Sequence, residues 1–258
     1  MDFSILDIVQ FFVLGAGVGM FGTLVGIGGG IVLVPIFLML YQWSPQHAIG
    51  TSLFCVMMNA LSGTFAYVKQ KKVFWHAAIR FGLATFPGAF LGSYVADYFT
   101  GGGFRITFGI VLMILALLTY FKPSKKADAT VFDAKTFRYN TVLGVGLSFA
   151  VGFLSSILGI GGGIIHVPAM VFLLSFPPHV ATATSQCVLG MSSAVGVISH
   201  GWLGNVLWDA GLAIGIGAAV GAQIGARVAK KTKSRTIMLI LSIVMFLVGV
   251  RMIAQAVM

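Results

Sequence analysis

Charged residues are scarce in this 258-residue sequence, and glutamate is missing altogether. Only 9% of the residues are charged, whereas 58% are hydrophobic and the mean hydropathy is +1.01. A water-soluble domain carries about 25% charged residues. The composition therefore excludes a water-soluble fold and indicates an integral membrane protein.

Acidic residues and cysteines are too few for most catalytic and metal sites. The two cysteines, Cys55 and Cys187, stand far apart in apolar sequence and have no metal-ligand spacing. No Ser/His/Asp set, paired carboxylates or HExxH motif is present. Cation transporters usually need carboxylates buried within the membrane. The only candidates, Asp97 and Asp209, lie near the ends of apolar runs, which argues against a cation transporter. We therefore expect no enzyme, no metal and no cofactor.

Basic residues outnumber acidic ones by 16 to 6, so the formal net charge is +10. They gather in polar segments between apolar runs, at 69–72, 122–138 and 227–235. Basic loops of this kind record membrane topology. We therefore expect a lipid bilayer around the chain and no nucleic-acid partner.

Charge spacing and turn residues divide the chain into apolar pieces. No charged residue lies between Asp7 and Lys69 or between Arg138 and Asp209, and one membrane crossing takes about 20 residues. The predicted pieces are 8–25, 31–41, 47–68, 76–99, 103–121, 142–158, 164–176, 180–200, 207–228 and 236–254. The second and seventh pieces are too short to cross a hydrocarbon core about 30 Å thick. The sequence leaves open whether they are re-entrant or spanning.

The sequence contains an internal duplication. Gly26–Pro35 reads GIGGGIVLVP and Gly159–Pro168 reads GIGGGIIHVP, so eight of ten positions are identical at an offset of 133 residues. We therefore predict a first transmembrane repeat at 1–121, a basic cytoplasmic linker at 122–141 and a second transmembrane repeat at 142–258.

The basic loops also set the orientation of the two repeats. With all three basic segments in the cytoplasm, each repeat holds an odd number of crossings, or an equivalent in which its first two pieces form a re-entrant hairpin. In either version the second repeat is inverted relative to the first. The predicted fold class is an all-α integral membrane protein with two inverted-topology repeats and eight to ten hydrophobic segments. Broken or re-entrant helices are expected at the two GIGGG motifs.

The two glycine motifs are candidates for a binding site. Successive glycines weaken a helix by about 1 kcal/mol each relative to alanine, and a break survives in a membrane only when it is buried in protein or faces a water-filled cavity. Two inward-pointing helix N-termini would form an anion site; the alternative is close helix packing through small residues. The glycines expected to contact the anion are Gly28, Gly29, Gly30, Gly161, Gly162 and Gly163.

Duplicated GIGGG motifs ending in Val-Pro, each followed by a histidine, a Thr-Ser pair and a helix rich in small residues, resemble the TauE/SafE family of sulfite and organosulfonate exporters. The resemblance covers nearly the whole chain. It implies transport of a small sulfur-containing or carboxylate anion, usually outward, across a bacterial cytoplasmic membrane. It leaves open the substrate, the direction, the coupling ion and assembly as a homodimer.

Neutral polar residues inside the spans could supply hydrogen bonds to such an anion. They are Thr51, Ser52 and Asn59 on one piece and Thr184, Ser185 and Gln186 on its counterpart. Hydroxyl and amide groups suit sulfonate or carboxylate oxygens, and the alternative is hydrogen bonding between helices. His166, which replaces Leu33 in the second motif, could carry charge or a proton near neutral pH. Its alternative role is that of a packed neutral histidine.

These features support one leading hypothesis and two alternatives. The leading hypothesis is a secondary transporter, a permease or exporter, for a small anion such as sulfite, sulfonate or sulfoacetate, working by alternating access in the bacterial inner membrane. One alternative is a transporter of an unrelated small carboxylate. The other is a non-transporting membrane scaffold or assembly protein, whose glycines serve only packing. The polar residues repeated on equivalent pieces favour transport.

Overall fold

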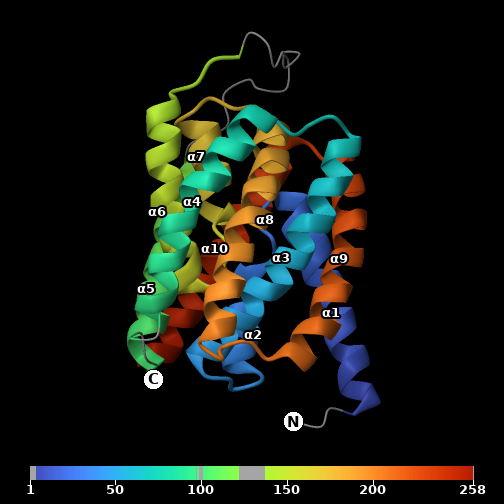
Figure 1. The fold of residues 1–258 in the computed structure, drawn as a ribbon, viewed down its shortest axis with the longest axis vertical. Helices are drawn as coiled ribbons and strands as arrows, with labels where there is room; N and C mark the ends of the chain where they lie inside the picture. The colour runs from blue at the N-terminus through green and yellow to red at the C-terminus, as the bar shows by residue number, and fades with distance from the viewer. Residues whose placement is uncertain (1–3, 97, 99–100, 122–136, 258) are drawn as a thin grey trace.

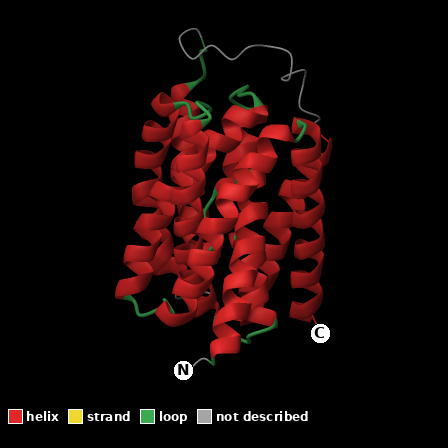
Figure 2. Cartoon of the chain, turned by 90° about the vertical axis from the view of Figure 1, so that its right-hand side faces the viewer, coloured by secondary structure: helices red, strands yellow, loops and turns green. Residues whose placement is uncertain are grey.

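The chain folds into a bundle of α-helices. The computed structural model describes residues 4–96, 98, 101–121 and 137–257, and within these ranges it contains ten helices and no strand (Figure 2). The helices are α1 (Ile5–Val25), α2 (Gly30–Met39), α3 (Pro45–Lys69), α4 (Trp75–Ala96), α5 (Gly101–Phe121), α6 (Thr141–Leu158), α7 (Gly163–Phe172), α8 (Pro178–Trp202), α9 (Trp208–Lys231) and α10 (Ser234–Val257).

Six of the described helices, α1, α3, α6, α8, α9 and α10, have the length and apolar composition needed to cross a membrane. The helices α2 and α7 have 10 residues each, which corresponds to about 15 Å and cannot span the hydrocarbon core. The predicted all-α integral membrane fold is thus confirmed.

Local sequence sets several helix starts. Ser4 accepts a hydrogen bond from the backbone N–H of Asp7, whose side chain accepts from Ser4 in return, so α1 begins with a capping box. Ser44 caps α3, with Pro45 in the first turn, where a missing N–H costs nothing. Asn140 caps α6 in the same way. These polar starts lie outside the apolar stretches that the membrane requires.

The two short helices lie at opposite ends of the bundle (Figure 1). Helix α1 runs inward from the end where both termini lie, and α2 returns to that end; α6 and α7 form the matching hairpin from the other end. This arrangement is compatible with the inverted repeats, which stay a prediction, as do the repeat boundaries. Residues 122–136 of the predicted linker lie outside the described residues.

Small residues allow the long helices to pack closely. A Cβ atom on Gly217 or Gly221 of α9 would meet backbone atoms of α1, and one on Gly88 of α4 would meet backbone atoms of α6. Small residues are the usual means by which membrane helices approach one another. These glycines therefore serve packing.

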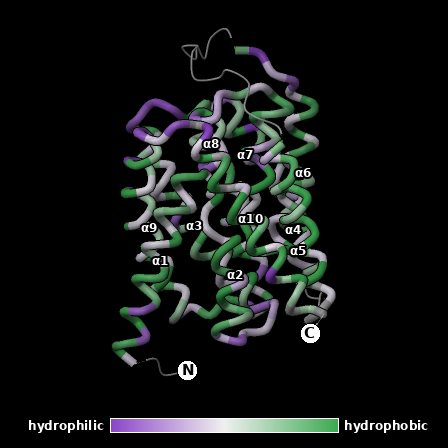
Figure 3. Tube along the Cα trace, turned by 180° about the vertical axis from the view of Figure 1, so that it is seen from behind, coloured by the Kyte–Doolittle hydropathy of each residue, from purple (hydrophilic) through white to green (hydrophobic). Residues whose placement is uncertain are grey.

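Polar residues gather at the two ends of the bundle, and the middle is apolar (Figure 3). Large apolar side chains on the outer faces are exposed, as lipid contact requires. Two basic segments meet at the end opposite the termini. There, partial burial lowers the pKa of Lys72, and the positive charge of the neighbouring Lys230 lowers it further. We expect this end to face the cytoplasm.

Single cysteines test this orientation. Ser175→Cys, in the loop after α7, should resist an impermeant thiol reagent added to intact cells, while Gly204→Cys, in the loop between α8 and α9, should react. Both positions are exposed, and the native Cys55 and Cys187 are buried and give little background. Labelling of Ser175→Cys from outside would reverse the orientation.

Candidate functional site

Each GIGGG motif interrupts a helix in the same way. Helix α1 ends at Gly26 with φ 84° and α2 begins after Gly29 with φ 89°; the second motif repeats this at Gly159, φ 68°, and Gly162, φ 79°. Residues with side chains rarely adopt this left-handed conformation, but glycine does so freely. The glycines therefore define where each helix stops and the short helix starts.

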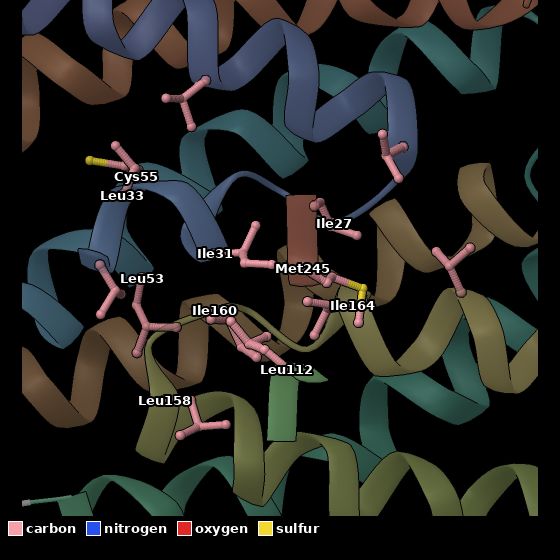
Figure 4. Close-up of a cluster of buried hydrophobic side chains, with 14 of the residues drawn as sticks. Ile27, Ile31, Leu33, Leu53, Cys55, Leu112, Leu158, Ile160, Ile164 and Met245 are labelled. Atoms are coloured by element: carbon pink, nitrogen blue, oxygen red, sulfur yellow. The ribbon is translucent and has the colours of Figure 1, made fainter. Parts of the chain in front are cut away.

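The two breaks pack against each other at the centre of the protein. A Cβ atom on Gly30 would lie 2.6 Å from the carbonyl oxygen of Gly159, and a Cβ atom on Gly163 would lie 2.7 Å from the Cα atom of Ile27. Ile27 and Ile160 join one apolar cluster around this contact (Figure 4). Gly30 and Gly163 are therefore required for backbone-to-backbone contact.

The first N–H groups of α2 and α7 have no acceptor within their own helices, and these helix ends carry a partial positive charge. Aliphatic side chains cover the neighbouring glycines: Gly28 and Gly161 both adjoin Val56 and Leu189. Val18 adjoins Gly29, and Val151 adjoins Gly162. In this conformation the positive helix ends are therefore enclosed by apolar groups.

Ser52 and Ser185 connect each break to the opposite half. The Ser52 hydroxyl donates to the carbonyl of Gly159 at 2.8 Å, and the Ser185 hydroxyl donates to the carbonyl of Gly26 at 3.3 Å. Both serines are fully buried. They satisfy carbonyl groups that the helix breaks leave free, so each half holds the break of the other.

The neighbouring threonines, Thr51 and Thr184, serve helix starts. The Thr51 hydroxyl accepts from the backbone N–H of Leu207 at 3.0 Å, just before α9. The Thr184 hydroxyl accepts from the backbone N–H of Phe74 at 3.1 Å, just before α4. Each threonine thus satisfies a donor that precedes the first turn of a helix in the other half.

A buried amide network joins α1, α3, α8 and α9. The Asn59 side-chain oxygen accepts from Thr23 at 3.0 Å and from Gln186 at 2.8 Å, and the Asn59 amide donates to the carbonyls of Gly19 and Ala218 at 2.8 and 3.3 Å. Asn59, Thr23 and Gln186 are all 0% exposed. Asn59 therefore has partners for both halves of its amide.

His166 lies in α7, 3% exposed, against α6. Its Nε2 atom lies 3.0 Å from the Ser148 hydroxyl, which donates to the carbonyl of Gly144 at 2.7 Å. Because a hydroxyl has one proton, Ser148 accepts from His166, and we assign the ring proton to Nε2. The ring of Phe81 packs 6.0 Å away. His166 is thus tied to a structural partner.

The structure brings the predicted site residues together in two places and leaves the others apart. Ser52 and Ser185 join the glycine breaks, Asn59 and Gln186 bind each other, and the remaining threonines and His166 lie at separate contacts. Sequence reasoning missed Thr23 and Tyr67, whose hydroxyl donates to the Thr23 carbonyl at 2.7 Å. The signal available for Thr23 was its own counterpart, a hydroxyl at Ser156, 133 residues later.

A cavity of about 350 Å³ lies between α2 and α10, apart from the glycine breaks. Its walls are apolar except for Arg251, near the end of α10. Helix α10 ends on the side of the bundle where the termini lie (Figure 1). Arg251 therefore places a positive charge at the end of the bundle that lies away from the basic loops.

The fold and these contacts define a multi-pass helical membrane protein with two broken helices that meet at its centre. The family model of the sulfite exporter TauE/SafE matches residues 11–252, and the chain belongs to this family. No solved structure matches the chain.

Curated relatives support the same class. The chain is 36% identical to the probable membrane transporter protein YunE of Bacillus subtilis (strain 168), over 98% of this chain and 99% of the relative. It is 30% identical to the probable membrane transporter protein MJ0441 of Methanocaldococcus jannaschii, over 78% and 75% of the two chains. Both relatives are named probable membrane transporter proteins.

The amide network yields a stability prediction. Asn59→Ala should lower the free energy of unfolding by about 2–3 kcal/mol, because Thr23 and Gln186 lose their shared acceptor inside an apolar bundle. Gln186→Leu should cost less, since it removes two hydrogen bonds, to Asn59 and Thr23, whereas Asn59→Ala removes four. Thermal unfolding of the purified protein in detergent measures both. Equal losses for the two variants would contradict the central role of Asn59.

Proposed function

We propose that the protein is a secondary transporter that moves a small sulfur-containing anion, such as sulfite, a sulfonate or sulfoacetate, across a bacterial cytoplasmic membrane. The observation that carries the proposal is the meeting of the N-terminal ends of α2 and α7 at the centre of the bundle. Helix N-termini attract anions through their free N–H groups and positive partial charge. Broken helices with this polarity are the usual anion sites of transporters built from repeats.

The positions of the two hairpins support alternating access. The α1–α2 hairpin opens toward one end of the bundle and the α6–α7 hairpin toward the other (Figure 1). Movement of one hairpin would expose the centre to one side, and movement of the other to the opposite side. Basic residues at one end and Arg251 at the other attract anions from both compartments.

Anion binding and transport test the proposal together. Sulfite, sulfonates or sulfoacetate should raise the Tm of the detergent-purified protein, with about 2.7 kcal/mol of stabilisation at 100 times the Kd, while chloride and organic cations should not. Proteoliposomes should take up the stabilising anion along its gradient. If only small carboxylates stabilised the protein, the substrate would be a carboxylate and the sulfur-containing anion would be rejected.

A membrane scaffold is the second candidate, and the tight packing of Gly30 and Gly163 against backbone atoms favours it. A scaffold needs no anion site, so neither stabilisation nor flux would appear with any anion. That joint outcome would reject transport. Native mass spectrometry of the same sample tests assembly as a homodimer.

Substitution of the enclosed glycines provides a second test of transport. Gly161→Ala should cost about 1–2 kcal/mol for its left-handed backbone, and its methyl group would overlap the Val56 side chain, which has to shift, beside the end of α7. We expect flux to fall at least tenfold while the protein still folds. Gly146→Ala on α6, whose Cβ would meet nothing within 4 Å, is the control. Normal flux in Gly161→Ala would show that the second glycine break takes no part in transport.

A further inference from the structure

The buried hydrogen-bond donors are distributed unequally between the two halves. At the offset of 133 residues, Thr23 corresponds to Ser156 and Asn59 corresponds to Ser192. Ser156 and Ser192 are 1% and 3% exposed, and neither hydroxyl has a hydrogen-bond partner in the described part of the chain. Thr23 and Asn59 bond each other in the first half, whereas the hydroxyls at the two equivalent positions of the second half are unpaired.

The backbone frame around these positions is the same in both halves. The Tyr67 hydroxyl bonds the carbonyl of Thr23 at 2.7 Å, and the ring of His200, at the equivalent position, bonds the carbonyl of Ser156 at 3.2 Å. A Cβ on Gly196 of α8 would lie 3.5 Å from the Ser156 hydroxyl. Ser156 of α6 therefore faces α8, as its counterpart faces α3.

The side chains around Ser156 and Ser192 differ from those around Thr23 and Asn59, and they offer fewer hydrogen-bonding groups. Ser192 is shorter than Asn59, and Leu53 stands where the other half has Gln186, so no amide reaches the hydroxyl of Ser156. A buried polar group without a partner destabilises a protein. Two such groups at one repeated position indicate a place that receives a polar ligand.

We infer that Ser156 and Ser192 form a binding position, between α6 and α8, for the oxygen atoms of a small oxyanion. This inference rests on the proposed function and assigns the substrate to the second half. Two hydroxyl donors match two oxygens of a sulfonate, sulfite or carboxylate group. Ser156 lies one turn before the second glycine break, whose short helix contributes positive charge. At the equivalent position of the first half, Asn59 already has hydrogen-bond partners for its oxygen and its amide.

Removal of the two hydroxyls tests this position. In Ser156→Ala/Ser192→Ala, the Kd for sulfite or methanesulfonate, measured by thermal-shift titration, should rise at least tenfold. The Tm without anion should stay the same or rise, because two unpaired buried hydroxyls are removed. Ser193→Ala is the matched control, since the Ser193 hydroxyl bonds the carbonyl of Leu189 in its own helix. It should leave the Kd unchanged.

An unchanged Kd in the double variant, with the wild type still stabilised, would overturn the assignment and leave the proposed function intact. A wild type that no anion stabilises and that carries no flux would overturn both. A second test introduces the residue types of the first-half network at the equivalent positions, so that it removes no polar group. Leu53→Gln/Ser156→Thr/Ser192→Asn should raise the Tm and abolish stabilisation by the anion. Retained anion affinity in this folded triple variant would also overturn the assignment.

Discussion

A helix that breaks inside a membrane leaves backbone carbonyl groups that lipid cannot satisfy, and the serine hydrogen bonds across the centre solve this problem for both halves. Ser52 bonds the carbonyl of Gly159, and Ser185 bonds the carbonyl of Gly26. Because each donor comes from the opposite half, neither break is complete without its partner half. The close contact between the two glycine loops follows from this mutual dependence.

The same dependence limits how the protein can move. Thr51 and Thr184 add two further bonds between the halves, at the starts of α9 and α4. Hydrogen bonds between membrane helices contribute about 0.6–2 kcal/mol each, so separation of all four contacts would cost several kcal/mol. Conformations of a transporter differ by only a few kcal/mol. Movement that opens one hairpin and keeps the other bonded satisfies both limits.

The sequence was sufficient to predict the helices and the breaks, since these depend on local chemistry. Charge spacing placed the spans, and three glycines in a row placed each interruption. The roles of Ser52 and Asn59 could not be predicted, because a hydroxyl or amide inside a span suits a ligand and a neighbouring helix equally well. Only the packing of the two halves decides between them. Thr23 was missed because it is a lone hydroxyl in an apolar run, and Ser156 because nothing in the Ser155–Ser156 pair distinguishes it from a packing residue.

The repeat makes it possible to separate frame from function. Gly26, Ser52 and their counterparts are identical in the two halves and hold the frame through the same bonds. Because identical residues form these bonds in both halves, the bonds do not depend on the positions that differ. Buried pairs that differ include Leu33 and His166, Leu53 and Gln186, Thr23 and Ser156, and Asn59 and Ser192. A transporter whose halves were chemically equal would offer the same site to both sides of the membrane. Under the proposed function, the chemical differences between the halves are where substrate choice and direction arise.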